Sequence, residues 1–519
     1  MDGNSKKLDA RPVRNVLANW GGFLITAVVS FFLSPYIVGK LGATSYGVWA
    51  LIGSFVGYLG LLDLGVRSAV TKFIASCHSA GDHKGASDMK SAAVLVFTVA
   101  GLLAVILAAG ISPFAEQMFS IPPDLEETAQ VIILVSGANI GVSIITGVYG
   151  GILAARHRFD LLNIINVILV GVRSTAVVFA LKAGQGITTL ATIQLLSSIV
   201  QLMLTHILSR KVYREAVTSI PQAFSTENIK KLLSFGLTTS MIHILGAIAH
   251  NSSLILIGSL LPVAMVTYYS ISQSLAEYAR TLMSGISQTV TPLVGAMEGA
   301  GQIDSIKHVL IDGTRYASLA TLPIIATFIV RGESFISLWM GEEYGQLSGQ
   351  ILTILSVALW AMAGYQICTT VMIGLGKHKG MVPIFAVEAV GNIGLSIILI
   401  REIGVLGGAW GALIPRLFVA LVLCVFYAKT VLHISIREYY INSIARPIMA
   451  ILPFIAVSYA IEIAWPASNL AVFFLQVALA IPAAILGSWI FGLNAKERMK
   501  YVTNIKHRVL ASAKDSRIS

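Results

Sequence analysis

The chain has 519 residues, of which 56% are hydrophobic and 12% charged, and its formal net charge is +11. A soluble domain carries about 25% charged residues, so this composition excludes both a soluble enzyme and a disordered chain. Apolar runs of about 20 residues recur along the whole sequence, which is typical of a polytopic membrane protein.

The N-terminal 14 residues are polar. The first apolar run that follows is too long for the core of a signal peptide, so we expect no cleaved segment. The three cysteines lie far apart in the sequence, and they predict neither a disulfide framework nor a metal site.

The apolar runs predict an all-α membrane protein with fourteen transmembrane helices. Runs of this length without alternation satisfy their own backbone hydrogen bonds in lipid, whereas barrel strands would be about 10 residues long and would alternate. The first seven runs cover residues 16–38, 47–70, 91–111, 129–154, 161–181, 187–208 and 232–257. The second seven cover residues 263–294, 309–330, 351–375, 382–400, 405–428, 444–463 and 470–491.

The basic residues support this count. With fourteen spans, one side of the membrane collects most of the Lys and Arg residues of the connecting segments, whereas the other side holds Lys40, Lys182, Arg331 and Arg401. Because cytoplasmic segments are rich in Lys and Arg, we expect both termini in the cytoplasm. The positive net charge then indicates contact with anionic lipid head groups, and nucleic-acid binding is not needed to explain it.

An internal repeat is visible when the spans are aligned. The segment GILAARHRF at 151–159 matches MIGLGKHKG at 372–380, and Tyr46 matches Tyr268 at nearly the same offset. Six helices separate the copies, so both copies have the same orientation, as in some transporters. We predict an N-lobe at 1–220, a C-lobe at 221–435, and a final helix pair with a basic cytoplasmic tail at 436–519.

Charged residues within the spans are the candidate functional residues, because a central Arg costs about 2.5–3.5 kcal/mol on insertion scales. Arg173, Arg280 and Arg416 lie near the middle of their spans, and we expect them to bind an anionic substrate in a central cavity. The alternative is that these arginines pair with backbone carbonyls or with Glu388. Arg280 has Glu277 one turn earlier on its own helix.

The remaining basic residues of the spans favour structural roles. Arg67 follows Asp63 by four residues, and Arg315 follows Asp312 by three, so each is expected to form a local pair. Arg446 opens its helix, and its side chain can reach the interface.

Ion coupling or gating is assigned to acids and histidines within the spans, together with Arg67, the neighbour of Asp63. The candidates are Asp63, Arg67, His243, His250, Glu277 and Glu388. His243 and His250 lie seven residues apart and share one helix face, where they could exchange protons or serve as neutral hydrogen-bonded side chains. Glu462 lies at the outer end of its helix and is expected to be solvated. We expect no cofactor and no metal, with protons or sodium as the coupling ion.

No enzyme signature is found. The longest outer connections, residues 112–128 and 331–350, are too short to present a catalytic domain, and no phosphate-binding loop of the GxxxxGK[ST] type occurs. Transport driven by an ion gradient or by the gradient of the substrate itself is therefore expected.

Several segments together resemble a known family. They are LGATSYGVWALIGSFVGYLGLLDLGVRSAVTKFIA at 41–75, the ARHRF loop at 155–159 and ISLWMGEEYG at 336–345. With the fourteen spans, they resemble the Wzx-type oligosaccharide flippases of the multidrug/oligosaccharidyl-lipid/polysaccharide (MOP) transporter superfamily.

The resemblance implies two six-helix lobes in a bacterial inner membrane. It also implies alternating access that moves an undecaprenyl-pyrophosphate-linked oligosaccharide, such as an O-antigen or exopolysaccharide unit, to the outer leaflet. The expected partners are the lipid-linked oligosaccharide, the bilayer, and polysaccharide polymerase and chain-length proteins. The alternatives are a lipid II flippase, a multidrug or cation exporter of the same superfamily, and a channel or scaffolding membrane protein.

Overall fold

The computed structural model describes residues 11–63, 65–214, 226–287, 290–495, 497–499 and 503. All regular elements in these residues are helical, and the chain divides into two compact units, Met1–Ser270 and Ile271–Ser519. The division of the sequence at residue 220 stays a prediction.

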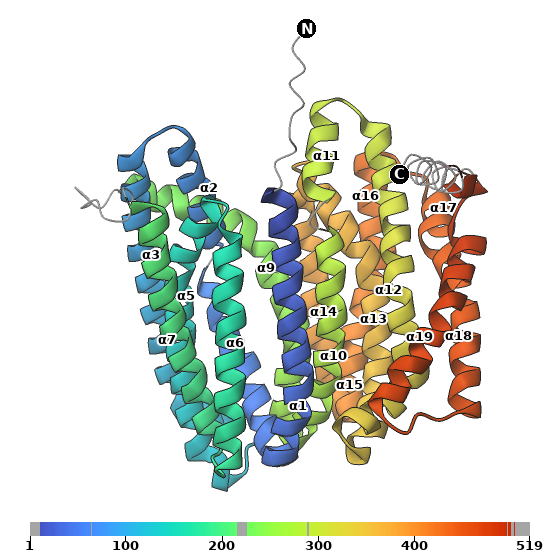
Figure 1. Cartoon of the computed structure of the whole chain (residues 1–519), viewed down its shortest axis with the longest axis horizontal. Coiled ribbons are helices and arrows are strands. Elements are labelled where there is room, and N and C mark those ends of the chain that lie inside the picture. The colour runs from blue at the N-terminus through green and yellow to red at the C-terminus, as the bar shows by residue number, and fades with distance from the viewer. Residues whose placement is uncertain are drawn as a thin grey trace, which may run out of the picture. The chain divides into compact units, whose positions relative to one another are not determined.

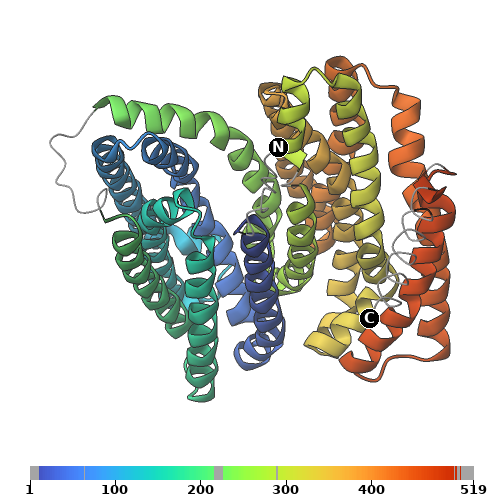
Figure 2. The same cartoon turned by 45° about the horizontal axis from the view of Figure 1, so that its top comes forward.

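Unit 1 is a bundle of long helices (Figure 1). Helices α3, α5 and α7 pack in that order, and α6 packs against α1 and α7. Figure 2 shows α9 crossing the ends of the N-terminal helices, where it contacts α2 and α3. The elements are α1 (Arg11–Gly57), η1 (Tyr58–Asp63), α2 (Val66–Ser79), α3 (His83–Ile111), η2 (Ser112–Phe114), α4 (Ala115–Met118), η3 (Pro123–Leu125), α5 (Glu126–Ala155), α6 (Phe159–Lys182), α7 (Ile187–Val212) and α9 (Thr226–Leu260).

Unit 2 is built around the antiparallel pair α12 and α13, with α14 packed on α15 and α18 packed on α19 and α12. Helix α10 begins at the end of unit 1 and continues into unit 2. The elements are α10 (Ala264–Ser287), α11 (Val290–Gly299), α12 (Ile303–Met340), α13 (Glu342–Gly374), η4 (His378–Gly380), α14 (Met381–Ile403), α15 (Val405–Phe418), η5 (Val419–Leu423), α16 (Cys424–Leu432), α17 (Ile436–Tyr439), η6 (Tyr440–Ala445), α18 (Arg446–Ala464), α19 (Leu470–Gly487) and η7 (Ser488–Gly492).

Eleven stretches of the described chain are long and apolar enough to cross a membrane. The difference from the fourteen predicted spans has three local causes. The first two predicted spans fall in one stretch, Gly21–Ser79, which is interrupted by Gly42 at φ 74° and ψ 168°. In α9 the described side chains form a shorter apolar stretch, Ile244–Leu260, because the side chains at 235–240 and 243 lie outside the described residues; α10, which carries Glu277 and Arg280, is not among the eleven.

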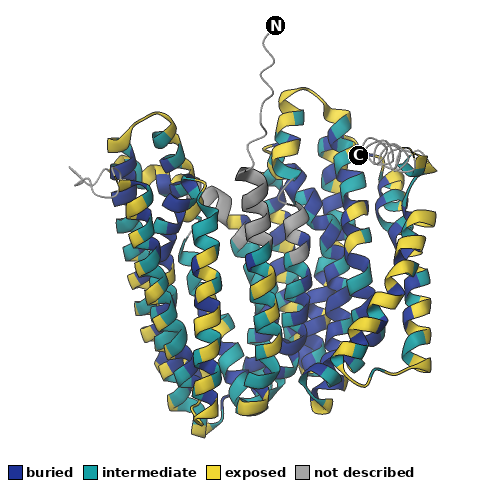
Figure 3. Cartoon of the chain, in the orientation of Figure 1, coloured by how far each residue is buried: buried dark blue, intermediate teal, exposed yellow. Residues whose placement is uncertain are grey.

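The large apolar residues on the surface show which faces meet lipid. Exposed residues recur along α3 and α7 (Figure 3). Leu102, Ile106 and Met203 on these helices are each more than half exposed. A soluble protein rarely exposes apolar patches of this extent, so these faces are the lipid-contacting surface of a multi-pass membrane protein.

Two interhelical turns of unit 1 have counterparts in unit 2. At the α2–α3 turn, Gly81 has φ 70° and Asp82 N–H donates to Cys77 O; at the α11–α12 turn, Gly301 has φ 70° and Gln302 N–H donates to Met297 O. Gly81, Asp82 and Cys77 correspond to Gly301, Gln302 and Met297, and the separation in sequence is the same for each pair. These bonds are those of a Schellman motif, whose left-handed residue favours glycine.

The α5–α6 and α13–α14 turns repeat the same pattern. Arg158 N–H donates to Leu153 O, and Lys377 N–H donates to Met372 O, while His157 and Gly376 have φ 55° and 64°. The backbone therefore matches Arg158 with Lys377, whereas the sequence alignment matched Arg156 with Lys377. The difference arises because the alignment paired the three basic residues of each loop, and the backbone pairs the turns.

Candidate functional site

Arg416 of α15 is paired with Glu388 of α14. Arg416 Nε donates to Glu388 Oε1 at 2.8 Å, and the side chains are 14% and 2% exposed. The second oxygen, Glu388 Oε2, is buried and has no hydrogen-bond partner in the described residues. The structure therefore pairs Arg416 with Glu388, the carboxylate that the sequence analysis named as the alternative to a substrate anion.

The approach of α14 and α15 explains how this pair forms. A methyl group built on Gly411 would lie 2.6 Å from backbone atoms of Ser396, and one built on Gly391 would lie 3.1 Å from Cβ of Pro415. Only glycine fits at position 411, whereas a side chain at position 391 would require Pro415 to move by a few tenths of an ångström. Glycines on both helices thus bring the backbones together at the level of Glu388 and Arg416.

Arg280 and Glu277 form a local pair on α10. Arg280 Nε donates to Glu277 Oε2 at 2.6 Å, and Arg280 Nη2 bonds to Glu277 Oε1. The two side chains are 37% and 36% exposed. This is the bidentate geometry that a guanidinium adopts with a carboxylate, so an anion that binds Arg280 must compete with Glu277.

Arg173 differs from the other two predicted substrate ligands. It lies near the middle of α6 and is partly buried. Within the described part of the chain, no side chain forms an ion pair or hydrogen bond with its guanidinium. An Arg at this depth is costly unless it meets water or an anion.

Asp63 and Arg67 lie where η1 gives way to α2. Asp63 Oδ1 accepts the backbone N–H of Arg67 at 3.3 Å, so the carboxylate caps the new helix instead of forming the expected side-chain pair. The guanidinium extends over α5 instead: a methyl group built on Gly150 would lie 3.3 Å from Arg67 Nη2 and 4.0 Å from Leu162 Cδ2.

The predicted histidine pair lies on α9. His250 is partly buried, and Ser252 and Ser253 beside it are 6% and 1% exposed. The side chain of His243 lies outside the described residues. A shared role for the two histidines, and the placement of this helix in a cavity, stay predictions.

Arg331 and Glu462 correct the sequence analysis. Arg331 was expected in an outer connection, but α12 continues to Met340 and Arg331 is 1% exposed. Its Nε donates to Glu462 of α18, which was expected to be solvated, and its Nη2 donates to the Gln476 side chain of α19. The guanidinium also lies 4.5 Å from the centroid of the Phe473 ring.

This cluster fixes the final helix pair to α12. Ser334 donates to Glu462, and Gln476 Nε2 donates to Trp465 O at 2.6 Å. The predicted span ended at Val330 because the apolar run stops before Arg331. The sequence signal that could have corrected this is that Arg331, Glu462 and Gln476 all lie near the predicted outer ends of their three spans.

A second buried arginine lies near the other end of α12. Arg315 contacts Asp312 Oδ1 at 3.0 Å, as the spacing predicted, and it also pairs with Glu497. Burial alone raises the pKa of the Glu497 carboxyl. The N–H of Asn494, the Tyr316 hydroxyl and the charge of Arg315 more than offset this, and the net pKa lies below its usual value.

Comparisons with known proteins agree with this architecture. The family model described as "Polysaccharide biosynthesis protein" matches residues 37–349. A Shigella flexneri protein named as an O-antigen transporter is 21% identical over 80% of this chain and 98% of its own length. A Haloferax volcanii protein named as a flippase, AglR, is 22% identical over 78% of this chain and 81% of its own length.

Two solved structures share the fold. The lipid II flippase MurJ in an inward closed conformation superposes with a TM-score of 0.73 at 15% identity, covering 92% of this chain and 98% of that one. An inward-facing multidrug MATE transporter gives 0.68 at 18% identity, with 80% and 98% covered. The family match spans more than half of the sequence, and the chain therefore belongs to the Wzx-like polysaccharide biosynthesis flippase family of the MOP superfamily, whose members are transporters and not enzymes.

Proposed function

We propose that this protein moves an undecaprenyl-pyrophosphate-linked oligosaccharide across a bacterial inner membrane by alternating access. The observation that carries the proposal is Arg173, a midspan cation with no carboxylate partner in the described residues, in a chain of the polysaccharide flippase family. A pyrophosphate group is a suitable counter-ion, because a guanidinium offers a planar fork of donors to phosphate oxygens.

Arg67 is proposed as a second phosphate contact. Its guanidinium lies against Gly150 of α5, and near the same glycine lies Leu162 at the start of α6. Arg173 is eleven residues further along this helix, which corresponds to about 16 Å along the axis. Two cations at different levels of one bundle could hold the head group at two stages of its passage.

Arg280 and Arg416 are proposed as secondary contacts. Each is already neutralised by Glu277 or Glu388, so an anionic substrate must displace a carboxylate to reach it. Glu388, a buried carboxylate within a span, is proposed for a role in proton or sodium coupling. Asp63, Glu277, His243 and His250 remain candidates for the same role.

We further propose fourteen transmembrane helices arranged as two six-helix lobes followed by a helix pair, with both termini in the cytoplasm. The two pairs of matching turns in units 1 and 2 support the repeat. The Arg331 cluster supports treating α18 and α19 as an added pair fixed to a lobe. Polymerase and chain-length proteins are proposed as partners on the basis of the family alone.

The test replaces Arg173 with Gln in a strain that lacks its own flippase. We expect loss of surface polysaccharide and accumulation of the untranslocated lipid-linked intermediate, with normal protein abundance on a membrane immunoblot. The matched control is Arg401→Gln, an exposed arginine at the end of α14, which should complement fully. Full complementation by Arg173→Gln would exclude this residue as a substrate ligand. Analysis of the accumulated lipid would separate a surface-polysaccharide unit from lipid II.

A further inference from the structure

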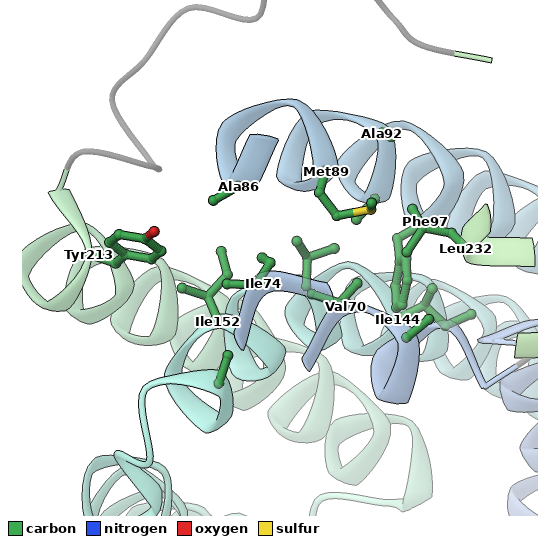
Figure 4. Close-up of a cluster of buried hydrophobic side chains, with 14 of the residues drawn as sticks. Val70, Ile74, Ala86, Met89, Ala92, Phe97, Ile144, Ile152, Tyr213 and Leu232 are labelled. Carbon is green, nitrogen blue, oxygen red and sulfur yellow. The ribbon is translucent and has the colours of Figure 1, made fainter. Parts of the chain in front are cut away.

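Helix α9 is anchored at one end and meets α1 at the other. Figure 4 shows Leu232, near the start of α9, beside Phe97 of α3, in a buried cluster that also includes Ile144 of α5. Leu232 and Phe97 are 0% and 1% exposed. The start of α9 is therefore fixed to the helices of unit 1. Its far end contacts the second half of α1 through a separate set of residues.

This second contact, the seam, joins residues 43–56 of α1 to residues 257–267, which end α9, form a turn and begin α10. Its apolar side chains are buried, since Leu51 of α1 and Ile257 of α9 are both 0% exposed. A methyl group built on Gly258 would lie 2.6 Å from Leu51 Cδ1. The side chain of Leu51 therefore lies against the end of α9.

Backbone meets backbone in the seam at Gly47. A methyl group built on Gly47 would overlap the carbonyl oxygen of Val263 and would lie 3.2 Å from Thr267 Oγ1. The Thr267 hydroxyl donates to the carbonyl of Ala43 at 2.5 Å, and Thr267 is 0% exposed. A backbone carbonyl cannot turn aside as a flexible side chain can. Glycine at position 47 is therefore what allows the seam to close.

The loop between α3 and α5 contacts both sides of the seam. On one side, Ser120 N–H donates to the carbonyl of Gly258 at 2.9 Å. On the other side, the ring of Phe119 packs edge-on against Phe55 of α1, with centroids 5.2 Å apart, and Phe119 is 3% exposed. The segment Ala115–Ile121, the strap, thus ties the end of α9 to α1.

The parts that form the seam are built to move. Gly42 has φ 74° and ψ 168°, which interrupts α1 immediately before the seam begins at Ala43. Element ends of this kind absorb backbone rotation in hinge motions. Helix α10 begins in the seam at Ala264 and continues into unit 2. A displacement of unit 2 relative to unit 1 would therefore act on the seam through α10.

We propose that the seam closes the outer side of the transport path and that the strap holds it shut. This inference rests on the proposed function, because alternating access requires a contact that closes one side and can separate. In the predicted topology the strap belongs to the outer connection at 112–128, which places the seam on the outer side. The contacts at Ala43, Gly47 and Gly258 join carbonyls, a hydroxyl group and apolar atoms, so their separation leaves no charge unpaired in the membrane.

The test measures how fast a water-soluble maleimide labels a cysteine in the seam of the full-length protein in detergent. The reporter is Leu51→Cys, in a chain whose three native cysteines are replaced by alanine. Because Leu51 is buried in the closed seam, labelling should be much slower than at Gly53→Cys, an exposed position on the same helix. Equally fast labelling of both reporters would overturn the proposal.

The variant Gly47→Ala should open the seam. Its methyl group meets the carbonyl of Val263, so the closed state becomes less favourable and the Leu51→Cys reporter should label about tenfold faster. The matched control is Gly53→Ala on the same helix. Gly53 is exposed, and nothing lies within 4 Å of a methyl group added to it, so its labelling should stay unchanged.

The strap is tested at one hydrogen bond. Ile121 N–H donates to Phe119 O at 2.8 Å, which makes Ser120 the central residue of a γ-turn. Ser120 has a negative φ, so the turn is of the inverse type, whose φ of about −75° suits proline. Ser120→Pro therefore removes the donor to Gly258 and keeps the turn, and labelling should become about fivefold faster. Ser120→Ala keeps the donor and should label as its parent does.

The outcomes separate the seam from the proposed cargo, since labelling needs no substrate. Unchanged labelling in both Gly47→Ala and Ser120→Pro would overturn the proposal, and Ser120→Pro alters only a loop, so it is expected to fold even if Gly47→Ala does not. In proteoliposomes, Gly47→Ala should lose leaflet exchange of a lipid-linked oligosaccharide and Gly53→Ala should keep it. Equal exchange by these two variants would also overturn the proposal. Absence of exchange in the wild type would contradict the proposed function instead.

Discussion

In unit 2, Arg315, Arg331 and Arg416 each lie within ion-pair distance of a carboxylate. In unit 1, Arg67 and Arg173 form no side-chain ion pair within the described residues, and the pair of Arg158 with Asp160 lies at a helix end. The two units share a repeated arrangement of turns. Arg331 and Arg416 of unit 2 thus join helices, whereas we propose that Arg67 and Arg173 of unit 1 stay available to anions.

The largest expected effect is on the stability of unit 2. Arg331→Met removes the cation that pairs with Glu462 and bonds to Gln476, and breaking a buried pair in this way costs about 3–5 kcal/mol. A fall in melting temperature of the detergent-purified protein measures it. The double variant Arg331→Met with Glu462→Met leaves no unpaired charge, so it should be more stable than the single variant. A double variant at least as unstable as the single one would show that the pair is not the cause.

The second effect is a pH dependence at the other end of α12. The pKa of Glu497 is lower in the folded protein than its usual value, so its carboxylate stabilises the fold above the unfolded pKa of about 4.3. This stability is lost as the pH falls through the lower, folded pKa. Melting temperatures measured between pH 7 and pH 3 should fall less steeply at the acid end for Glu497→Gln. Superimposable curves for both proteins would contradict this role for Glu497.

The smallest effect on stability is expected in unit 1. Gly150→Ala places a methyl group 3.3 Å from Arg67 Nη2, the end of a flexible side chain, and Ala also favours a helix over Gly by about 1 kcal/mol. The melting temperature should therefore change little, whereas transport should fall as the guanidinium moves. Gly411→Ala meets the backbone of Ser396 in unit 2 and should cost about 1–3 kcal/mol. Equal losses of stability would remove the contrast between the units.

Much of the fold follows from hydropathy, because long apolar runs in lipid have few options besides helices. The all-helical class and the positions of α3, α5, α6 and α7 agree with the predicted runs. The run at 263–294 was less reliable, because Glu277 and Arg280 make α10 amphipathic. The predicted gap between the first two runs, residues 39–46, contains Gly42, whose non-helical backbone interrupts α1.

The pairing of charges was only partly predictable. Asp312 and Arg315, and Glu277 and Arg280, are neighbours on one helix, so spacing was sufficient to pair them. Arg331 and Glu462 lie on helices far apart in the sequence, and a run of hydropathy values says nothing about which helices meet. The pairing of Glu497 was not predicted either, because Glu497 lies in the basic tail and its partner Arg315 is far away in the sequence.

The central claim is that Arg173, a cation of unit 1 without a carboxylate partner in the described residues, is the main ligand of the substrate phosphate, and that Arg280 and Arg416 of unit 2 are only secondary contacts. The direct measurement is leaflet exchange of a fluorescent lipid-linked oligosaccharide in proteoliposomes that contain equal amounts of each variant. Arg173→Met should abolish exchange, while the charge-neutral double variant Glu388→Met with Arg416→Met should retain measurable exchange. Wild-type exchange by Arg173→Met, together with loss of exchange in the double variant, would contradict the account.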